Sequence, residues 1–130
     1  MSEIQNFLAA SSFGVAGASS NREKYGNKVL RAYLQNGYAT IPIHPVESHV
    51  EGHEAYPDLA NAPEIESLSI ITPPAVTEQI VEQAIDAGVK NLWMQPGAES
   101  QTAIDRAREA GLTVIAGGPC LLVVLRFREQ

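Results

Sequence analysis

The feature that most constrains the fold of this chain is a junction that occurs three times. The segments YLQNGYATIPI, AIDAGVKNLWM and AREAGLTVIAG each run from an amphipathic helical pattern through a glycine into a short apolar run. These glycines, Gly37, Gly88 and Gly111, stand where the C-terminus of a helix favours a left-handed residue. Each junction therefore predicts a helix that stops at the glycine and is followed by a strand.

The segments around these junctions predict five strands. They cover residues 12–16, 39–43, 67–72, 90–94 and 112–116 and lack strict alternation, which is typical of parallel strands covered on both faces. Helical stripes lie between them: Val29, Leu30, Tyr33 and Leu34; Val76, Ile80, Val81, Ala84 and Ile85; and Ala103, Ile104, Ala107 and Ala110. Strands that alternate with helices imply right-handed crossovers. The predicted fold class is α/β, a Rossmann-like three-layer sandwich with a mostly parallel five-stranded sheet.

Three other segments complete the expected fold. Residues 1–12 lack a basic region and carry Glu3, so they predict a short amphipathic helix rather than a signal peptide. Residues 44–66 are interrupted by proline and glycine, which predicts a loop with one short helix around residues 55–60. The tail CLLVVLRF, residues 120–127, fits either a helix or a sixth strand.

Composition limits the classes of protein that the chain can represent. With 130 residues, 45% of them hydrophobic, it has the size of one compact domain spanning residues 1–130. A net charge of −6 with nine Lys and Arg argues against a nucleic-acid partner. The longest apolar run, residues 120–125, is far below the ~20 residues that cross a bilayer. The single cysteine, Cys120, excludes an internal disulfide, and we expect a cytoplasmic protein with no membrane partner.

Ligand contacts are expected at the edge where the parallel strands end, because open sheets of this class bind ligands beyond the carboxyl ends of their strands. The turns at this edge follow each of the five predicted strands. The candidate ligand-binding residues are Gly14, Ala16, Gly17, Ala18, Ser19, Ser20, Arg22, Lys24, Tyr25 and Gly26 with the first turn, His44, Pro45 and Val46 with the second, Thr72, Pro73 and Pro74 with the third, Gln95, Pro96 and Gly97 with the fourth, and Cys120 with the fifth.

The first of these turns, within FGVAGASSNREKYG at residues 13–26, has the composition of a phosphate cradle. Its glycines let the backbone approach a ligand, and Ser19 and Ser20 offer hydroxyl donors. Arg22 and Lys24 bring positive charge to a position before a helix N-terminus. Phosphate or pyrophosphate is the ligand that this combination favours. The alternative is that these are only the turn residues of a β–α connection.

A nicotinamide cofactor is disfavoured by the second strand. Dinucleotide-binding folds usually have three closely spaced glycines and an acidic residue at the end of the second strand, where it binds the ribose hydroxyls. Here that strand ends TIPIHP, with His44 and Pro45 at the place of the acid.

The stretch HPVESHVEGHE, residues 44–54, invites a metal site because imidazoles and carboxylates both bind zinc. Its candidate ligands are His44, His49, His53, Glu47, Glu51 and Glu54. Their spacing matches no metal motif, and a polar loop of this kind is more often solvated. We therefore expect no metal.

No reaction centre is predicted. The chain contains no G-x-S-x-G, H-E-x-x-H or G-x-x-x-x-G-K-[ST] motif. No catalytic base is indicated for Cys120, and a lone cysteine before LLVV is more often buried, although it could line a ligand site. No catalytic residue is therefore predicted.

Two other turns have both a structural and a functional interpretation. The proline pair of ITPPAV, residues 71–76, suits the first turn of a helix, and the functional alternative is a rigid apolar wall beside an adenine ring. MQPGAES, residues 94–100, could close the other side of such a ring with Gln95. Trp93 lies within an apolar strand and is expected in the core.

Taken in order, these segments resemble the CoA-binding domain family, the small stand-alone relatives of the N-terminal domain of the succinyl-CoA synthetase alpha subunit. The matching segments are VAGASSNREKYGNKVLRAYLQNGYATIPIHP, VEGHEAYPDL, ITPPAVTEQIVEQAIDAGVKNLWMQPGAES and AREAGLTVIAGGPC. Their most specific part is the combination of a GAS loop, a lysine five residues beyond its serine, a G-Y-x-x-x-P-x-x-P second strand and a W-x-Q-x-G turn.

The resemblance implies a Rossmann fold that holds coenzyme A. Residues 17–19 would lie near the phosphates with Lys24 close by, and the turns after strands two, three and four would surround the adenosine end and the pantetheine arm. Two positions depart from the family: His44 stands where asparagine is common, and LLVVL follows Cys120 where an acidic residue is common. The synthetase chemistry is not implied, because its phosphohistidine and succinyl-phosphate site belong to a following domain that we do not expect here.

The function expected from the residues and the resemblance together is the binding of coenzyme A or a short acyl-CoA by a non-catalytic carrier, sensor or subunit. An NAD(P)-binding oxidoreductase or redox sensor is one alternative. A protein-interaction scaffold that has lost ligand binding is another. A homodimer and association with a larger assembly both stay open.

Overall fold

The computed structural model describes residues 2–129 and confirms the Rossmann-like α/β fold. Five parallel strands form one sheet in the order β2-β1-β5-β6-β7. They are β1 (Phe13–Ala16), β2 (Thr40–Ile43), β5 (Ser67–Ile70), β6 (Asn91–Met94) and β7 (Thr113–Ile115). Each lies within one residue or two of its predicted range, because short apolar runs bounded by glycine specify strands locally.

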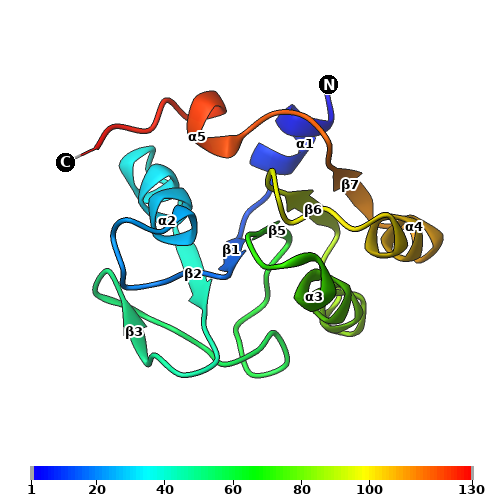
Figure 1. Ribbon diagram of the computed structural model, residues 1–130, viewed down its shortest axis with the longest axis horizontal. Helices are drawn as coiled ribbons and strands as arrows, with labels where there is room; N and C mark the ends of the chain where they lie inside the picture. The colour runs from blue at the N-terminus through cyan, green and yellow to red at the C-terminus, as the bar shows by residue number, and fades with distance from the viewer. Residues whose placement is uncertain (1, 130) are drawn as a thin grey trace.

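Helices cover both faces of this sheet (Figure 1). Helices α1 (Glu3–Leu8), α2 (Tyr25–Gln35) and α5 (Leu121–Val124) lie on one face, and α3 (Pro74–Ala87) and α4 (Gln101–Glu109) lie on the other. The first face is packed with aromatic side chains, and the rings of Phe7 and Trp93 meet edge to face with centroids 5.4 Å apart. The second face is aliphatic. Trp93 is fully buried, as expected, and its indole N–H donates to the carbonyl of Pro119.

The three glycine junctions have the predicted geometry. Gly37, Gly88 and Gly111 have φ angles of 80°, 80° and 89°. A left-handed residue at each site ends the helix and turns the chain into the next strand. The apolar stripes are shorter than predicted, because Val76 in the first turn of α3 and Ala110 after α4 are exposed.

The prediction of a short helix around residues 55–60 is wrong. Tyr56 instead pairs with Ile43 of β2. Its N–H donates to the carbonyl of Pro42 at 3.1 Å, and the N–H of His44 donates to the carbonyl of Tyr56 at 2.9 Å. Pro57 favours this extended backbone, since it disfavours the helical conformation of the residue before it.

The same crossover contains a small antiparallel hairpin that the sequence did not reveal. It is formed by β3 (His49–Val50) and β4 (His53–Glu54), which pair apart from the main sheet. The tail forms helix α5, so it adds no sixth strand to that sheet. The N-terminal helix is confirmed and begins with a capping box between Ser2 and Gln5. None of the helices within residues 2–129 is long and apolar enough to cross a membrane.

Candidate functional site

The sheet reverses its strand order between β1 and β5. The chain leaves β1 toward β2 on one side and later enters β5 on the other side of β1 (Figure 1). The connection after β1 leads to α2 on one face, and the connection after β5 leads to α3 on the opposite face. A crevice outside the carboxyl ends of strands at such a switch point is the usual ligand position in doubly wound sheets. We call residues 17–24, which connect β1 to α2, the β1–α2 loop.

Glycines press the β1–α2 loop between the end of β5 and the start of α2. Gly17 has a φ of +96°, and a Cβ atom there would overlap the carbonyl of Ile71. A Cβ atom on Gly26 would overlap the carbonyl of Gly17. Any side chain at either position would therefore push the loop off the sheet. Gly14 differs, because the atoms near its Cβ position belong to the side chains of Ile65 and Leu68, within the core.

The loop contains backbone hydrogen-bond donors that the chain does not use. Within residues 2–129, the backbone N–H groups of Ala18 and Ser19 donate to no partner. Helix α2 starts next to them, and its N-cap residue, Lys24, makes no side-chain capping bond. Lys24 is exposed and forms no ion pair in the described part of the chain. A helix N-terminus with free N–H groups and a nearby ammonium is suited to an anion.

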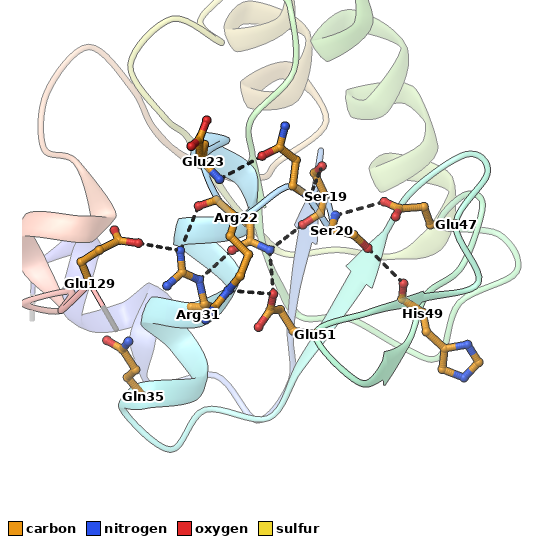
Figure 2. Close-up of polar contacts among 12 residues, drawn as sticks. Ser19, Ser20, Arg22, Glu23, Arg31, Gln35, Glu47, His49, Glu51 and Glu129 are labelled. Atoms are coloured by element: carbon orange, nitrogen blue, oxygen red, sulfur yellow. Dashed lines mark hydrogen bonds and ion pairs between the residues drawn. The ribbon is translucent and has the colours of Figure 1, made fainter.

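A buried polar network holds the loop from the inside (Figure 2). The side chain of Asn27 is fully buried, and its Nδ2 donates to the carbonyl of Ser19 at 2.7 Å. Its Oδ1 accepts from Nε of Arg31 at 2.6 Å. Nη2 of Arg31, also buried, donates to the carbonyl of Arg22 at 3.0 Å and to the carboxylate of Glu129 at 3.2 Å. The network thus ties the loop, at Ser19 and Arg22, to α2, and ties α2 in turn to the C-terminal tail.

Two carboxylates from the neighbouring crossover reach the loop. Oε2 of Glu47 accepts from the backbone N–H of Ser20 at 3.1 Å. Oε2 of Glu51 accepts from Nδ2 of Asn27 at 3.0 Å and lies 3.3 Å from Nε of Arg22. Figure 2 shows the two glutamates on different parts of the loop, one at Ser20 and one near the start of α2. The sequence interpretation had grouped both with a solvated stretch.

His44 shapes the segment that carries Glu47. Its Nδ1 accepts from the backbone N–H groups of Val46 at 3.0 Å and Glu47 at 2.9 Å, so the proton of the neutral ring resides on Nε2. That Nε2 lies 3.4 Å from Oε2 of Glu47. An asparagine side chain makes the same kind of bond to backbone N–H groups two and three residues ahead. His44 therefore makes the turn contacts that an asparagine could make at this position.

The carboxyl group of Glu47 is held in its charged form. Hydrogen bonds from Ser20, first from its hydroxyl and then from its backbone N–H, lower the pKa of Glu47, and the charges of His44 and Lys24 act in the same direction. The hydroxyl of Ser20 also lies 3.4 Å from the carbonyl of His49, and its one proton serves one of these acceptors at a time.

A second polar group joins α2 to the far end of the sheet. The hydroxyl of Tyr25 donates to Oε1 of Gln95 at 3.0 Å and lies 2.6 Å from Sγ of Cys120. Since the tyrosine proton is used on Gln95, the thiol donates to the tyrosine oxygen. Oε1 of Gln95 also accepts from the N–H of Leu121 at 2.9 Å, which fixes the orientation of the amide. Burial, followed by the hydrogen bond with Cys120, raises the pKa of Tyr25.

The remaining predicted site residues have mixed exposure. Pro45 and Val46 are exposed, whereas Gln95 is fully buried and reaches the edge only through Tyr25. Pro73 and Pro74 form the N-cap and first residue of α3, as their structural interpretation predicted. Other residues of these turns are also placed at the carboxyl edge: Thr72, whose hydroxyl pairs with Thr77, and the exposed Pro96 and Gly97.

No metal-binding group is present in residues 2–129: at no point do three His, Cys, Asp or Glu side chains converge. His49 and His53 lie exposed on the hairpin. A hollow lined by Leu59, Ile65 and Val89, among others, lies at the amino ends of β5 and β6, opposite the loop.

Sequence reasoning missed the residues that organise the loop, above all Asn27 and Arg31. The signal was present but weak. These two polar residues are four apart and border the apolar stripe of α2, a position that buries both of them. Their partner Glu129 lies 98 residues beyond Arg31 in sequence, so no local pattern indicates the contact.

Comparison with known proteins places the chain in a family. A family model described as "CoA binding domain" matches residues 11–126. A conserved hypothetical protein from Pyrococcus furiosus is similar over 87% of this chain and 97% of its own, with 33% identity and a TM-score of 0.82. A hypothetical protein from Pyrococcus horikoshii OT3 is similar over 93% and 85% of the two chains, with 30% identity and a TM-score of 0.87.

A larger enzyme contains a similar unit. The dinucleotide forming acetyl-coenzyme A synthetase 1 of Ca. Korarchaeum cryptofilum, in complex with phosphate and ADP, shares 26% identity and a TM-score of 0.74 with this chain. The similarity covers 82% of this chain and 25% of that enzyme. The family model spans nearly all of the sequence. The chain therefore belongs to the CoA-binding domain family.

Proposed function

We propose that this chain binds coenzyme A or a short acyl-CoA at the β1–α2 loop, as a carrier, sensor or subunit that catalyses no reaction itself. The observation that carries the proposal is the set of free backbone donors at Ala18 and Ser19, beside the uncapped N-terminus of α2. Membership of the CoA-binding domain family supports the choice of ligand.

The pyrophosphate of coenzyme A fits this loop chemically. Its oxygens would accept from the free N–H groups, and Lys24 would add a charge-assisted hydrogen bond. Hydrogen bonds to charged groups contribute about 1.5 to 3 kcal/mol each when they exclude water. Gly17 supports the proposal as well, because only glycine lets the backbone lie so close to the end of β5.

The proposal includes no catalytic step, and the hydrogen bonds of Tyr25 and Cys120 support this choice. The thiol of Cys120 donates its hydrogen bond to Tyr25, and the raised pKa of Tyr25 keeps that hydroxyl protonated at neutral pH. Neither group is then available as a base or a nucleophile in this arrangement.

Isothermal titration calorimetry with coenzyme A tests the proposal. Lys24→Ala should weaken binding by about tenfold, the loss of roughly 1.4 kcal/mol of charge-assisted bonding. Lys90→Ala is the matched control, since Lys90 is exposed at the amino end of β6, on the opposite edge of the sheet. Equal affinity in the wild type and Lys24→Ala would show that the phosphate site lies elsewhere.

A dinucleotide such as NAD(H) is a second candidate, favoured by one observation. Glu47 brings a carboxylate from the segment after β2 to the β1–α2 loop, and a carboxylate from that direction binds ribose hydroxyls in dinucleotide-binding folds. Thermal shift with coenzyme A, acetyl-CoA, NADH and NADPH compares the two, because a ligand at ~100 times its Kd stabilises by ~2.7 kcal/mol. Stabilisation by NADH alone would replace the first proposal with the second.

A further inference from the structure

One backbone donor of the β1–α2 loop, the N–H of Ser20 beside the free N–H groups, already holds an anion that belongs to the chain itself. The carboxylate of Glu47 accepts from the N–H of Ser20 at 3.1 Å and lies 3.4 Å from Nε2 of His44. Lys24 is close enough for its charge to act on the carboxylate. Ser20 and Lys24 are two of the residues that the sequence assigned to phosphate, and His44 is a candidate ligand-binding residue of the next turn. The internal carboxylate therefore lies where an anionic ligand is expected.

The carboxylate can leave this position without unfolding the segment that carries it. The Glu47 side chain is about one-third exposed (32%), so a rotation about its own bonds moves the carboxylate into solvent. The backbone of the segment stays fixed by the bonds from Val46 and Glu47 to the ring of His44. The base of the hairpin is anchored by the buried residues Val50 and Ala55.

Other groups that face the carboxylate do not hold it firmly. The hydroxyl of Ser20 is shared with the carbonyl of His49, at 3.4 Å. Glu51, the second carboxylate at the loop, is engaged with Asn27 and Arg22 and brings negative charge to the same region. Exposed contacts between charged and polar groups of this kind contribute little to stability, which suits a contact that a ligand replaces.

We infer that Glu47 is an internal competitor of the ligand. Its carboxylate accepts from the N–H of Ser20 in the free protein and must leave this N–H when a phosphate binds. The inference rests on the proposed function, since it describes how that same site is regulated. A competitor of this kind lowers the apparent affinity by the fraction of molecules in which the site is open. It also favours ligands whose charge exceeds that of a carboxylate, such as a pyrophosphate, over uncharged nucleosides.

The inference distinguishes two roles that a carboxylate could have at this loop. A competitor repels the bound phosphate and is displaced by it. A carboxylate that binds ribose hydroxyls contacts the ligand directly and is needed for affinity. Removing the charge of the Glu47 side chain while keeping its shape therefore raises the affinity for the ligand if Glu47 is a competitor and lowers it if Glu47 binds the ribose.

The test is titration of the wild type and two variants with coenzyme A. Glu47→Gln keeps the shape of the side chain and removes its charge, and we expect coenzyme A to bind about threefold to tenfold more tightly. Glu54→Gln is the matched control, because Glu54 lies exposed in β4, makes no bond to the loop and changes the net charge by the same amount. The affinity of the Glu54→Gln variant for coenzyme A should equal that of the wild type.

A second readout follows the contact itself. In ¹⁵N–¹H spectra without ligand, the Ser20 amide of Glu47→Gln should differ from that of the wild type, because a charged acceptor has been replaced by a neutral one. With saturating coenzyme A the two proteins should give the same Ser20 amide position. Identical spectra without ligand would show that the contact is not formed.

Each outcome of the titration has one meaning. Tighter binding by Glu47→Gln alone, or binding by that variant when the wild type shows none, supports the competitor. Unchanged binding, equal tightening in both variants, or weaker binding by Glu47→Gln overturns it while leaving the proposed function standing. No binding of coenzyme A by any of the three proteins overturns the proposed function and, with it, the inference.

Discussion

Helices α2 and α4 both begin at the carboxyl edge of the sheet, but only one of their N-termini is closed by the chain. Ser100 caps α4: its Oγ accepts from the N–H of Ala103 at 3.2 Å and donates to Glu78 at 2.6 Å. Lys24 stands at the corresponding position of α2 and makes no side-chain cap. An absent cap costs a helix about 1 kcal/mol, so the open end of α2 is a stability loss that an anionic ligand can offset.

The same comparison extends to the loops in front of the two helices. Before α4, the turn is completed locally, since the N–H of Gly97 donates to the carboxylate of Glu99 two residues later. Before α2, the local turn bonds of Asn21 and Glu23 are supplemented by two residues of the helix, because Asn27 and Arg31 donate to the carbonyls of Ser19 and Arg22. The N–H groups of Ala18, Ser19 and Arg22 donate to no partner within residues 2–129. The loop before α2 is thus bonded to buried side chains of the helix but retains backbone N–H groups without a partner within residues 2–129.

The largest expected effect comes from Gly17→Ala. A Cβ atom there would overlap the carbonyl of Ile71 and would also force a side chain into a left-handed backbone, so we expect the free energy of unfolding to fall by about 3 to 4 kcal/mol. Gly97→Ala is the matched control, because Gly97 has almost the same φ, +95°, with nothing near its Cβ position. It should lose only about 1 kcal/mol. Urea denaturation measures both, and equal losses would show that the loop is not pressed against β5.

Asn27→Ala should have the next largest effect. It leaves Nε of the buried Arg31 and the carbonyl of Ser19 without partners, and we expect a loss of about 2 to 3 kcal/mol. Asn61→Ala is the control, since Asn61 is exposed and bonds only to the nearby Asp58, and it should lose less than about 1 kcal/mol. Similar losses in chemical denaturation would contradict a central role for the buried network.

Adding a cap to α2 and removing the cap of α4 should have opposite effects on stability. Lys24→Ser should stabilise α2 by up to about 1 kcal/mol and weaken coenzyme A binding, because the new hydroxyl would occupy a free N–H group and the ammonium would be lost. Ser100→Ala should destabilise the fold by about 1 kcal/mol and leave binding unchanged. Thermal unfolding and calorimetry report the two quantities. Weaker ligand binding in Ser100→Ala would remove the distinction between the helices.

The smallest expected effect is a dependence on acidic pH. Because hydrogen bonds from Ser20 lower the pKa of Glu47 in the folded protein, the contribution of this contact to stability is complete above the ordinary value of 4.5 and is lost as the pH falls through the lowered pKa. A carbon-detected NMR titration should place the midpoint of Glu47 below 4.5, and Ser20→Ala should move it upward. A midpoint that Ser20→Ala leaves in place would contradict the assigned cause.

The parts of this structure that depend on local pattern could be predicted from the sequence. The five strands and the three glycine stops follow from short apolar runs and left-handed helix ends. The crossover after β2 could not be predicted in this way. Strands β3 and β4 have two residues each, too few for a periodicity, and the extended backbone at Tyr56 depends on pairing with Pro42.

In the candidate site too, the residues of one local segment could be predicted and those placed by the tertiary fold could not. The glycines, serines and lysine of the β1–α2 loop were recognisable from composition, because they belong to one short segment. The position of Glu47 could not be predicted in this way, because its segment is also typical of a solvated loop. Only the folded chain brings Glu47 to Ser20. Asn27 and Arg31 were missed because burial of polar residues at a helix edge depends on what packs against them.

The most direct test of the account is an ¹⁵N–¹H NMR titration of the full chain with coenzyme A. We predict that the largest amide shifts occur at Ala18, Ser19 and Ser20 and that the amide of Ala103, at the capped start of α4, stays in place. Binding that leaves the amides of Ala18 and Ser19 unchanged, or that shifts Ala103 most, would contradict the assignment of the ligand to the open N-terminus of α2.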